Sequence, residues 1–183
     1  LLRHYLSSGQ AEGRKPSARG KAGDSLKLTN EQIALVWSPV PLKDLANYKS
    51  LKKKMTDEQY QAAYQEAVNL VLPVALSSRE EQLTYIAAAL RERFDSGMSY
   101  SMDADHYNDP YGYFVLGSAS CAGCTRATGL CLNVLGISYE HVNENQYSHQ
   151  WCRVPMEDGS YWICDAFGLY CGPEPEPYQH PYF

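Results

Sequence analysis

The sequence lacks any long hydrophobic run, since its longest apolar stretch, residues 68–76, is interrupted by Asn69 and Pro73. A bilayer-spanning helix needs about 20 consecutive apolar residues, so the sequence predicts no membrane span. Cysteine is too scarce for a disulfide scaffold, with six residues among 183. The whole sequence is 44% hydrophobic and 20% charged. This is the composition of a globular protein that can bury one sizeable core.

Lysine is absent after residue 54, and this absence divides the chain by charge. Residues 1–54 carry 11 Lys and Arg against 4 Asp and Glu, whereas residues 55–183 carry 5 Arg against 17 acidic residues. An acidic body repels phosphate, so nucleic acid is not expected as a partner. A basic segment can dock on an acidic domain of its own or a neighbouring chain, although a solvated linker fits these charges equally well.

The first part of the basic segment has a biased composition. Residues 8–25 are rich in Ser, Gly, Ala, Lys and Arg and show no apolar periodicity. We therefore predict a flexible basic arm over residues 1–30 and a single domain over residues 31–183. The sequence starts with Leu1 rather than Met and has no apolar signal core. This start suggests a trimmed precursor that has lost its signal, so the expected location is secreted or cell-surface.

Three helices are predicted from capping patterns and apolar periodicity. Two of them begin with the Ser/Thr-x-x-Glu/Gln pattern of a capping box and continue with an apolar stripe of helical period. The third is followed by Gly136, and glycine suits the left-handed conformation of the residue that follows many helices. The first helix is capped by Thr56 and Gln59 and ends before Pro73, the second is capped by Ser78 and Glu81 and covers residues 79–94, and the third covers residues 121–135.

Short extended runs follow the helices, over residues 137–142, 148–156 and 160–166. The last two are joined by a three-residue loop whose Gly159 suits a hairpin. Helices followed by antiparallel strands predict an α+β domain. Three other segments have weaker patterns: residues 33–37 are predicted as a strand or an anchoring turn, residues 95–119 as a long loop, and residues 172–183 as an extended tail.

Cys121, His149 and Asp165 have the order expected of a site with a nucleophilic cysteine. Cys121 opens the third helix, where unpaired N–H groups and the helix dipole favour a thiolate. His149 and Asp165 follow on the strands, so that the thiolate attacks, the imidazole moves the proton and the carboxylate fixes the imidazole tautomer. We therefore predict these three residues to be catalytic, with no cofactor and no metal ion.

The predicted hairpin places two of these residues together. With a loop at residues 157–159, His149 and Asp165 project from the same face of the sheet as diagonal neighbours. The same register sets Cys152 opposite Cys164 on the other face. Either a cross-strand disulfide or two reduced thiols is compatible with that pairing.

These residues resemble the transglutaminase-like branch of the papain-like superfamily. That family reads roughly Gly-x-Cys-x-Gly-Tyr/Phe-Ala through a helix to Leu-Gly-Ile, then His-Ala-Trp-Asn and Trp-Tyr-x-x-Asp. The resemblance covers about residues 80–170 and implies a papain-like α+β domain whose nucleophile helix packs on a small antiparallel sheet. It implies Cys121, His149 and Asp165 as the catalytic residues. The corresponding stretches in this sequence are residues 119–125, 135–137, 149–152 and 161–165.

The sequence departs from the family pattern at three points around the site. Cys124 replaces the usual aromatic residue and Cys152 the usual Asn, and Asp165 lacks the Pro-Thr that often follows it. These changes affect the packing around the site and leave the three catalytic positions in place.

Three other interpretations use the same residues. Cys121 and Cys124 have the spacing of a thioredoxin-type redox pair, but no βαβ unit precedes them. A zinc site using these cysteines would lack a second close pair of ligands. A catalytically silent binding domain is the third alternative. The other histidines are not expected to be catalytic: His4, His106, His141 and His180.

The predicted function is thiol-dependent acyl transfer through a Cys–His–Asp triad and a thioester. With water as the acceptor the protein is a cysteine peptidase or amidase that acts on a peptide or protein substrate, and this is the favoured interpretation. With an amine as the acceptor it is a cross-linking transglutaminase. Tyr100 and Tyr113 are the candidates for a second donor to the oxyanion.

Overall fold

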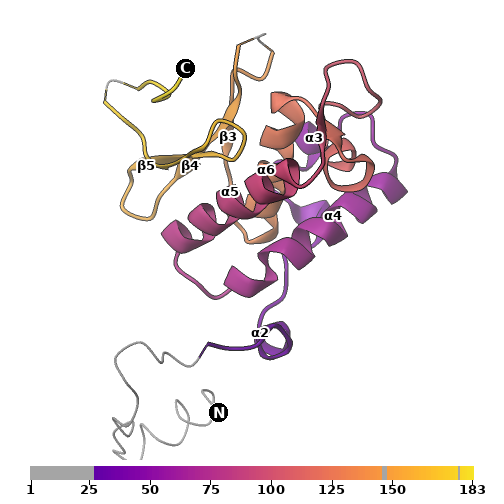
Figure 1. The fold of residues 1–183 in the computed structure, drawn as a ribbon. Coiled ribbons are helices and arrows are strands. Elements are labelled where there is room, and N and C mark those ends of the chain that lie inside the picture. The colour runs from indigo at the N-terminus through magenta and orange to yellow at the C-terminus, as the bar shows by residue number, and fades with distance from the viewer. Residues whose placement is uncertain (1–26, 146–147, 177) are drawn as a thin grey trace, which may run out of the picture.

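The computed structural model describes residues 27–145, 148–176 and 178–183. Of the described residues, 46% are helical and 14% are in strands, with the helices first and an antiparallel sheet last (Figure 1). The predicted α+β class is therefore confirmed. Most of the predicted basic arm, residues 1–26, lies outside the described residues.

The first described helix, α2 (Asn30–Val36), covers a segment that we predicted as a strand or turn, and that prediction is wrong. Thr29 and Gln32 form a capping box at its start, with reciprocal backbone–side-chain hydrogen bonds of 3.2 and 2.8 Å. Ile33 is its buried residue, so the apolar stripe is too short to indicate a helix from the sequence. A 3₁₀ turn η2 (Leu42–Asp44) and the short helix α3 (Tyr48–Lys52) follow.

The two capping boxes predicted for the next helices are both present. Helix α4 (Asp57–Val71) starts at the Thr56–Gln59 box and ends in a 3₁₀ turn η3 (Leu72–Val74), and α5 (Arg79–Asp95) starts at the Ser78–Glu81 box. Each helix buries one face in the core. The buried residues of these two helices are Tyr60, Ala63, Tyr64, Ala67, Val71, Gln82, Leu83, Ile86, Ala87 and Leu90.

Helix α6 (Cys121–Val134) lies at the centre of the domain, and all its residues after Cys121 are buried. It contacts α4 and α5 along one part of its surface and strand β4 along another. Gly136 follows it with φ +82°, as expected for the residue after a helix C-terminus. Helix α6 is therefore held on several sides by the rest of the fold.

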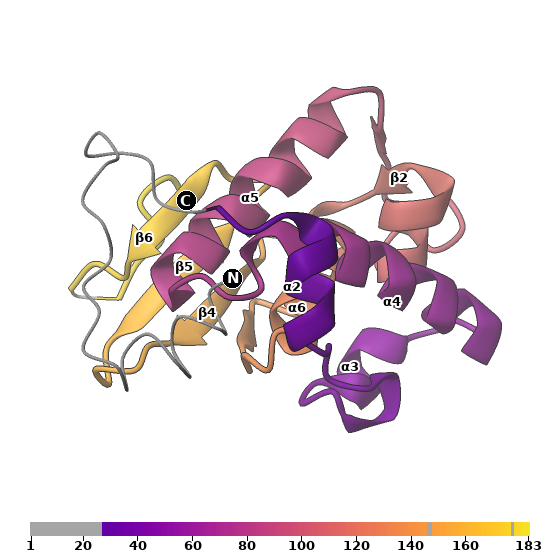
Figure 2. The same ribbon diagram turned by 90° about the horizontal axis from the view of Figure 1, so that it is seen from below.

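The sheet has the order β3-β4-β5-β6 and is antiparallel throughout. Helix α5 lies alongside β5 and β6, and α6 lies beside β4 (Figure 2). The predicted hairpin is present, with Gly159 at φ +85° and Cys152 opposite Cys164. The strand that begins the predicted tail, β6, was not anticipated. The four strands are β3 (Glu140–Val142), β4 (Trp151–Pro155), β5 (Tyr161–Asp165) and β6 (Tyr170–Pro173).

The predicted loop over residues 95–119 contains more structure than expected. Strand β1 (Ser99–Tyr100) pairs in parallel with β2 (Ser118–Ala119), and a π-helix, η4 (Gly112–Leu116), lies between them in sequence. Tyr100 pairs with Ala119 in this small sheet. That pairing brings Tyr100 close to the residue that starts α6.

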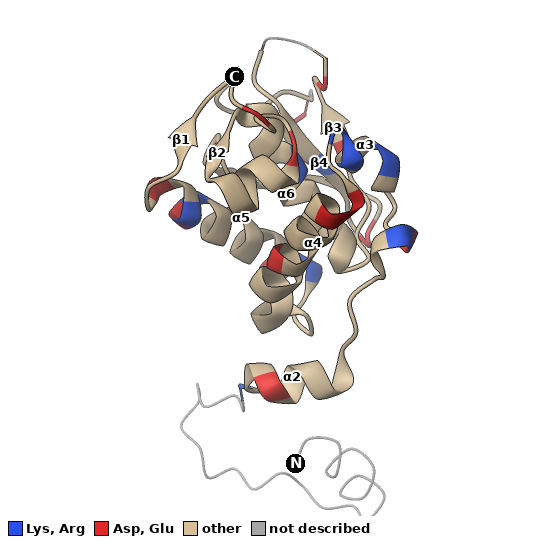
Figure 3. Ribbon diagram, turned by 90° about the vertical axis from the view of Figure 1, so that its right-hand side faces the viewer, with Lys and Arg blue, Asp and Glu red and all other residues tan. Residues whose placement is uncertain are grey.

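No helix among the described residues is long and apolar enough to cross a membrane. The described lysines all occur at or before residue 54, and four of them lie on α3 or directly after it (Figure 3).

Candidate active site

Cys121 is the first residue of α6, and its position is fixed by the loop that precedes the helix. Ser120 caps the helix, and its backbone N–H donates to the carbonyl oxygen of Tyr107 at 2.8 Å. A Cβ at Gly123 would overlap that same carbonyl group. The close approach of the loop to the first turn therefore requires glycine at this position.

Hydrogen bonds tie this helix to the segment that carries His149. The Thr125 hydroxyl lies 2.8 Å from the carbonyl oxygen of Cys121 and 2.9 Å from that of Gln150. The Cys152 thiol donates to the Thr125 carbonyl oxygen at 3.3 Å. His149 lies two residues before β4 begins, so the prediction that it belongs to a strand is wrong.

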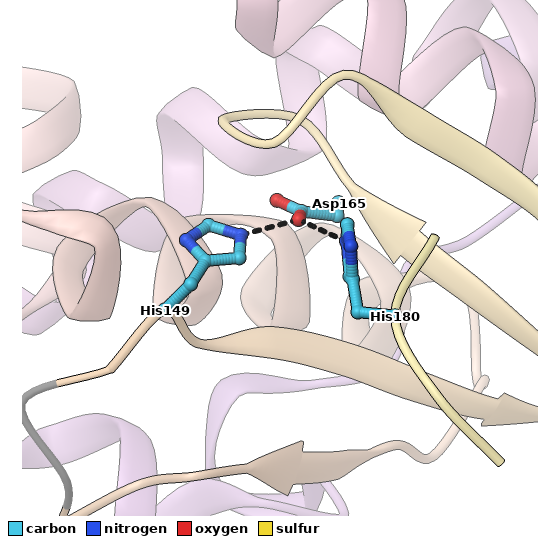
Figure 4. Close-up of side chains that lie close together, drawn as sticks. All are labelled: His149, Asp165 and His180. Carbon is cyan, nitrogen blue, oxygen red and sulfur yellow. Dashed lines mark hydrogen bonds and ion pairs between the residues drawn. The ribbon is translucent and has the colours of Figure 1, made fainter. Parts of the chain in front are cut away.

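The imidazole of His149 and the carboxylate of Asp165 form a short hydrogen bond, with Nε2 and Oδ2 2.5 Å apart (Figure 4). Asp165 is the last residue of β5 and is 3% exposed. Its other oxygen, Oδ1, accepts the backbone N–H of Gly168 at 2.8 Å. The second ring nitrogen of His149, Nδ1, points away from Asp165 and is left to make the hydrogen bond between His149 and the thiol of Cys121.

These contacts shift the three groups toward their charged forms. Burial alone would raise the pKa of the Cys121 thiol, but hydrogen bonds from His149 and Tyr100 outweigh burial and lower it. Burial opposes protonation of His149, yet its hydrogen bonds to Asp165 and Cys121 raise its pKa to about 9. Burial likewise acts against the Asp165 carboxylate, whose pKa is nevertheless lowered by hydrogen bonds from His149 and His180. The arrangement therefore favours a thiolate beside an imidazolium.

The structure separates the two tyrosines that the sequence left as equal candidates. Tyr100 hydrogen-bonds to Cys121, and its ring stacks on Phe167 with centroids 5.4 Å apart. Tyr113 is buried in the core, and its hydroxyl donates to the carbonyl oxygen of Leu90 at 2.5 Å. Tyr100 is therefore placed to act on the sulfur, whereas Tyr113 is not.

His180, which we did not expect to be catalytic, lies beside the carboxylate of Asp165. His180 lies in the last described segment, is 1% exposed, and places Nε2 2.8 Å from Oδ2 of Asp165 (Figure 4). No local pattern in the sequence indicated this contact, because the segment has neither periodicity nor a motif.

Two other histidines make local contacts away from the sulfur. His106 pairs with Asp109 at 2.6 Å. Nε2 of His141 lies 2.7 Å from Oε1 of Gln150, and burial lowers the His141 pKa to about 4. His4 lies outside the described residues.

One group among the described residues has the composition of a metal site: ligand atoms of His149, Asp165 and His180 all lie within 4.8 Å of one another. Nδ1 of His180 accepts the backbone N–H of Tyr182 at 3.1 Å, so in the neutral ring Nε2 carries the proton. A metal on Nε2 would move that proton to Nδ1, where it would face the Tyr182 N–H. The group therefore fits hydrogen bonding better than metal binding.

The alternatives based on the cysteines also lack support in the structure. The metal-compatible group contains no cysteine. All six cysteines lie within the described residues and are free. Cys124 is buried, and burial raises the pKa of its thiol, which does not suit a redox partner for Cys121. Its side chain is instead part of the hydrophobic core.

A cavity of about 280 Å³ opens beside Cys121, which is itself only partly buried. Tyr100 lies on one side, and Lys53, Arg126 and Glu144 contribute charged groups. Glu144 accepts from Arg126 at 2.8 Å and pairs with Lys53 at 3.6 Å. A small acyl-bearing group can therefore approach the sulfur through a polar pocket.

Aromatic rings surround the imidazole of His149. Phe183 stacks on it with centroids 4.0 Å apart, and Trp151 and Phe167 lie at 6.0 and 6.1 Å. Rings at these distances limit the access of water to the hydrogen bond between His149 and Asp165.

No known protein-family profile matches this chain, and no curated protein matches its sequence.

Proposed function

We propose that this protein is a thiol-dependent acyl-transfer enzyme of papain-like, transglutaminase-like architecture, and that it hydrolyses an amide bond of a peptide or protein. The observation that carries the proposal is the hydrogen-bonded chain from a partly exposed Cys121 through His149 to a buried Asp165, beside a cavity. A cysteine that serves only packing has no need of a base oriented by a carboxylate.

In the proposed first step the Cys121 thiolate attacks the amide carbonyl carbon. The carbonyl π electrons move to oxygen, and the resulting oxyanion is stabilised by N–H groups at the start of α6 and by the Tyr100 hydroxyl. The C–N bond then breaks, His149 gives its proton to the leaving amine, and a thioester remains on Cys121. Asp165 keeps Nδ1 of His149 directed at the sulfur throughout.

In the second step His149 accepts a proton from water as the water attacks the thioester. Collapse of the tetrahedral intermediate releases the carboxylic acid and restores the thiolate–imidazolium pair. The same thioester would transfer its acyl group to an amine if one entered the site before water. The choice of acceptor thus distinguishes a hydrolase from a cross-linking transglutaminase.

The most direct test is the alkylation of Cys121 by iodoacetamide near pH 6, followed by mass mapping of all six cysteines. Selective modification of Cys121 is expected, because its thiol is activated at a pH where an ordinary thiol with pKa ~8.5 reacts slowly. The matched control is His149→Ala, in which Cys121 loses its hydrogen-bond partner. Equal rates in the two proteins would rule out the activated nucleophile.

The acceptor is tested by incubating the protein with an unstructured peptide mixture and a primary amine. New peptide termini identify a peptidase, conversion of Gln to Glu identifies a side-chain amidase, and incorporation of the amine identifies a transglutaminase. Cys121→Ser serves as the control for contaminating activity. If Cys121 is activated but no product forms from a broad peptide mixture, the binding-module interpretation is favoured instead.

A further inference from the structure

The last described segment, residues 178–183, brings a second imidazole to the carboxylate of Asp165. His180 and His149 approach the same oxygen, Oδ2, from two sides, with Nε2 at 2.8 and 2.5 Å (Figure 4). The two histidines come from segments about 30 residues apart in the sequence. Asp165 therefore joins the last segment of the described chain to the histidine beside Cys121.

The proton on His180 can be assigned from its hydrogen bonds. Its Nδ1 accepts the backbone N–H of Tyr182 at 3.1 Å. A ring nitrogen that accepts carries no proton, so Nε2 of the neutral ring is the donor to Asp165. The N–H of Tyr182 therefore orients the ring, so that the Nε2–H of His180 donates to Oδ2 of Asp165.

With this donor, each oxygen of Asp165 accepts at least one hydrogen bond. Oδ2 accepts from His149 and His180, and Oδ1 accepts from the N–H of Gly168 at 2.8 Å. A carboxylate that accepts three hydrogen bonds is held both in orientation and in its ionised form. Loss of one donor would leave a buried anion under-solvated, and such a group protonates more easily or turns away.

The surroundings of His180 keep its ring in place. The ring centroid of Trp151 lies 4.9 Å away and that of Phe183 lies 5.2 Å away, both in edge contacts. An apolar side chain would fill this aromatic pocket without any cost of burying polar atoms. The presence of an imidazole with both nitrogens bonded therefore indicates a role for its N–H group.

We propose that His180 is a positioning residue for the reaction at Cys121. It holds the Asp165 carboxylate with Oδ2 against Nε2 of His149, which leaves Nδ1 of His149 for the sulfur. This inference rests on the proposed thiol chemistry and adds a fourth member, supplied by residues 178–183, to the Cys121–His149–Asp165 chain.

The test compares His180→Gln, His180→Asn and His180→Leu by the pH dependence of Cys121 alkylation. The amide nitrogen of Gln reaches about the position of ring Nε2 and can donate to Asp165, whereas the amide of Asn is too short. Gln179→Leu is the matched control, since its side chain is exposed in the same segment. Low-field proton NMR of the Nε2–H between His149 and Asp165 provides a second readout.

His180→Leu and His180→Asn should raise the midpoint of the alkylation profile by about one pH unit, so that the rate below the midpoint falls about tenfold. The low-field proton signal should move or broaden. His180→Gln should retain most of the wild-type profile and Gln179→Leu all of it. If His180→Leu does not fold, the comparison of Gln with Asn carries the same information.

Two negative results have different meanings. If wild-type Cys121 is activated and all folded His180 variants share its profile and NMR signal, the positioning role is wrong and the proposed function stands. If wild-type Cys121 titrates as an ordinary thiol, the proposed function fails before the variants are compared.

Discussion

At the scale of single residues, the site combines two opposite pKa shifts on neighbouring groups. The Cys121 thiol has a lowered pKa although burial opposes this, and the pKa of His149 rises to about 9. Each shift needs the other, because a thiolate attracts the imidazolium proton and the imidazolium stabilises the thiolate. The two groups therefore titrate as a pair, and in the proposed mechanism this pair supplies the thiolate that attacks.

This pairing predicts a bell-shaped pH dependence of kcat/KM. The thiolate–imidazolium pair is present above the lowered pKa of Cys121 and below about 9, the pKa of His149. Activity should fall as the pH drops and the sulfur takes a proton, and again as the pH rises through about 9 and His149 loses the proton needed by the leaving amine. Alkylation of Cys121, which needs no proton donor, should lack the alkaline fall. A kcat/KM that still rises above pH 9 would contradict the pair.

Replacing Tyr100 or Tyr113 by Phe removes one hydroxyl group in each case, so the two variants form a matched pair. Tyr100→Phe removes the hydroxyl that contacts Cys121, so kcat should fall about 100-fold, as for the loss of one oxyanion donor. Tyr113→Phe removes a hydroxyl that donates to Leu90, so it should cost about 1 kcal/mol in the free energy of unfolding and leave kcat near wild type. Steady-state kinetics and denaturant unfolding separate the two effects. Equal kcat values for both variants would remove Tyr100 from the site.

Gly168 is a residue whose lack of a side chain matters for the chemistry. A Cβ at this position would overlap Oδ2 of Asp165 and lie 2.8 Å from Nε2 of His149. Gly168→Ala should therefore displace the carboxylate or the imidazole and lower kcat/KM by about 100-fold, the usual effect of a displacement near 1 Å. Gly172→Ala is the control, since its Cβ meets nothing closer than 3.4 Å. Wild-type kinetics for Gly168→Ala would mean that the Asp165 turn adjusts without loss.

The grouping of Cys121, His149 and Asp165 was largely predictable from the sequence, whereas the choice between the tyrosines was not. Cys121 was identified by its place at a helix start, and the hairpin pattern related His149 to Asp165. Tyr100 and Tyr113 occur in one irregular segment and have the same side chain. Their roles are decided by the β1–β2 pairing and the π-helix η4, which depend on contacts that leave no periodic pattern.

At the scale of secondary-structure elements, helices with caps and long apolar stripes were predictable and short elements were not. The boxes at Thr56 and Ser78 fixed the starts of α4 and α5, because the cap is a local interaction within four residues. Helix α2 buries a single residue, and strand β6 pairs with β5 across a turn without alternating burial. In both cases tertiary packing determines the element.

The sheet also predicts which disulfide forms on oxidation. Cys164 lies opposite Cys152 on one side and Cys171 on the other. The Cys152 thiol donates to the Thr125 carbonyl oxygen at 3.3 Å, and the Cys164 thiol lies 3.6 Å from the carbonyl oxygen of Leu83. The Cys164 sulfur also contacts the sulfur of Cys171, and this hydrogen bond lowers the pKa of Cys171. A mild thiol oxidant such as diamide should therefore link Cys164 to Cys171. Of these two residues, the partly exposed Cys171 supplies the attacking thiolate.

Non-reducing peptide mapping by mass spectrometry measures this outcome. Cys171→Ser should abolish the crosslink, and Cys131→Ser, a change of a cysteine deep in the core, should leave the same pair of residues linked in the folded protein. A Cys152–Cys164 crosslink would instead mean that the Cys152 side chain turns away from α6. The register of the sheet is compatible with either disulfide, so the side-chain contacts alone distinguish between them.

At the scale of the whole molecule, the residues of the site come from segments that no single sequence pattern relates to one another. The loop that ends in β2 sets Cys121, the segment before β4 carries His149, and the end of β5 carries Asp165. Residues 178–183 then supply His180 and the ring of Phe183 that stacks on His149. A segment rich in proline and without periodicity gives no indication of such long-range contacts, which is why the contact of His180 with Asp165 could not be predicted.

Positive charge is concentrated in residues 1–54 and negative charge in residues 55–183. Four of the six described lysines lie on α3 or directly after it (Figure 3). The remaining body has an excess of carboxylates, and residues 1–26 add further positive charge. If these basic residues dock on an acidic body, the attraction should weaken as salt rises and the Debye length falls from about 30 Å at 0.01 M to about 8 Å at 0.15 M. Activity or oligomeric state should then differ between the wild-type chain and a variant whose basic residues 14, 15, 19 and 21 are replaced by Gln.

The difference should be present at low ionic strength and vanish at high ionic strength, since only the Coulomb term responds to salt. Steady-state kinetics and sedimentation velocity at both salt concentrations measure the two quantities. A variant in which the uncharged Ser7, Ser8 and Gln10 are replaced by Ala controls for changes in the segment that leave its charge intact. Identical behaviour of the wild-type and neutralised chains at low salt would show that the basic segment is a solvated linker, and that the acidic body does not need it.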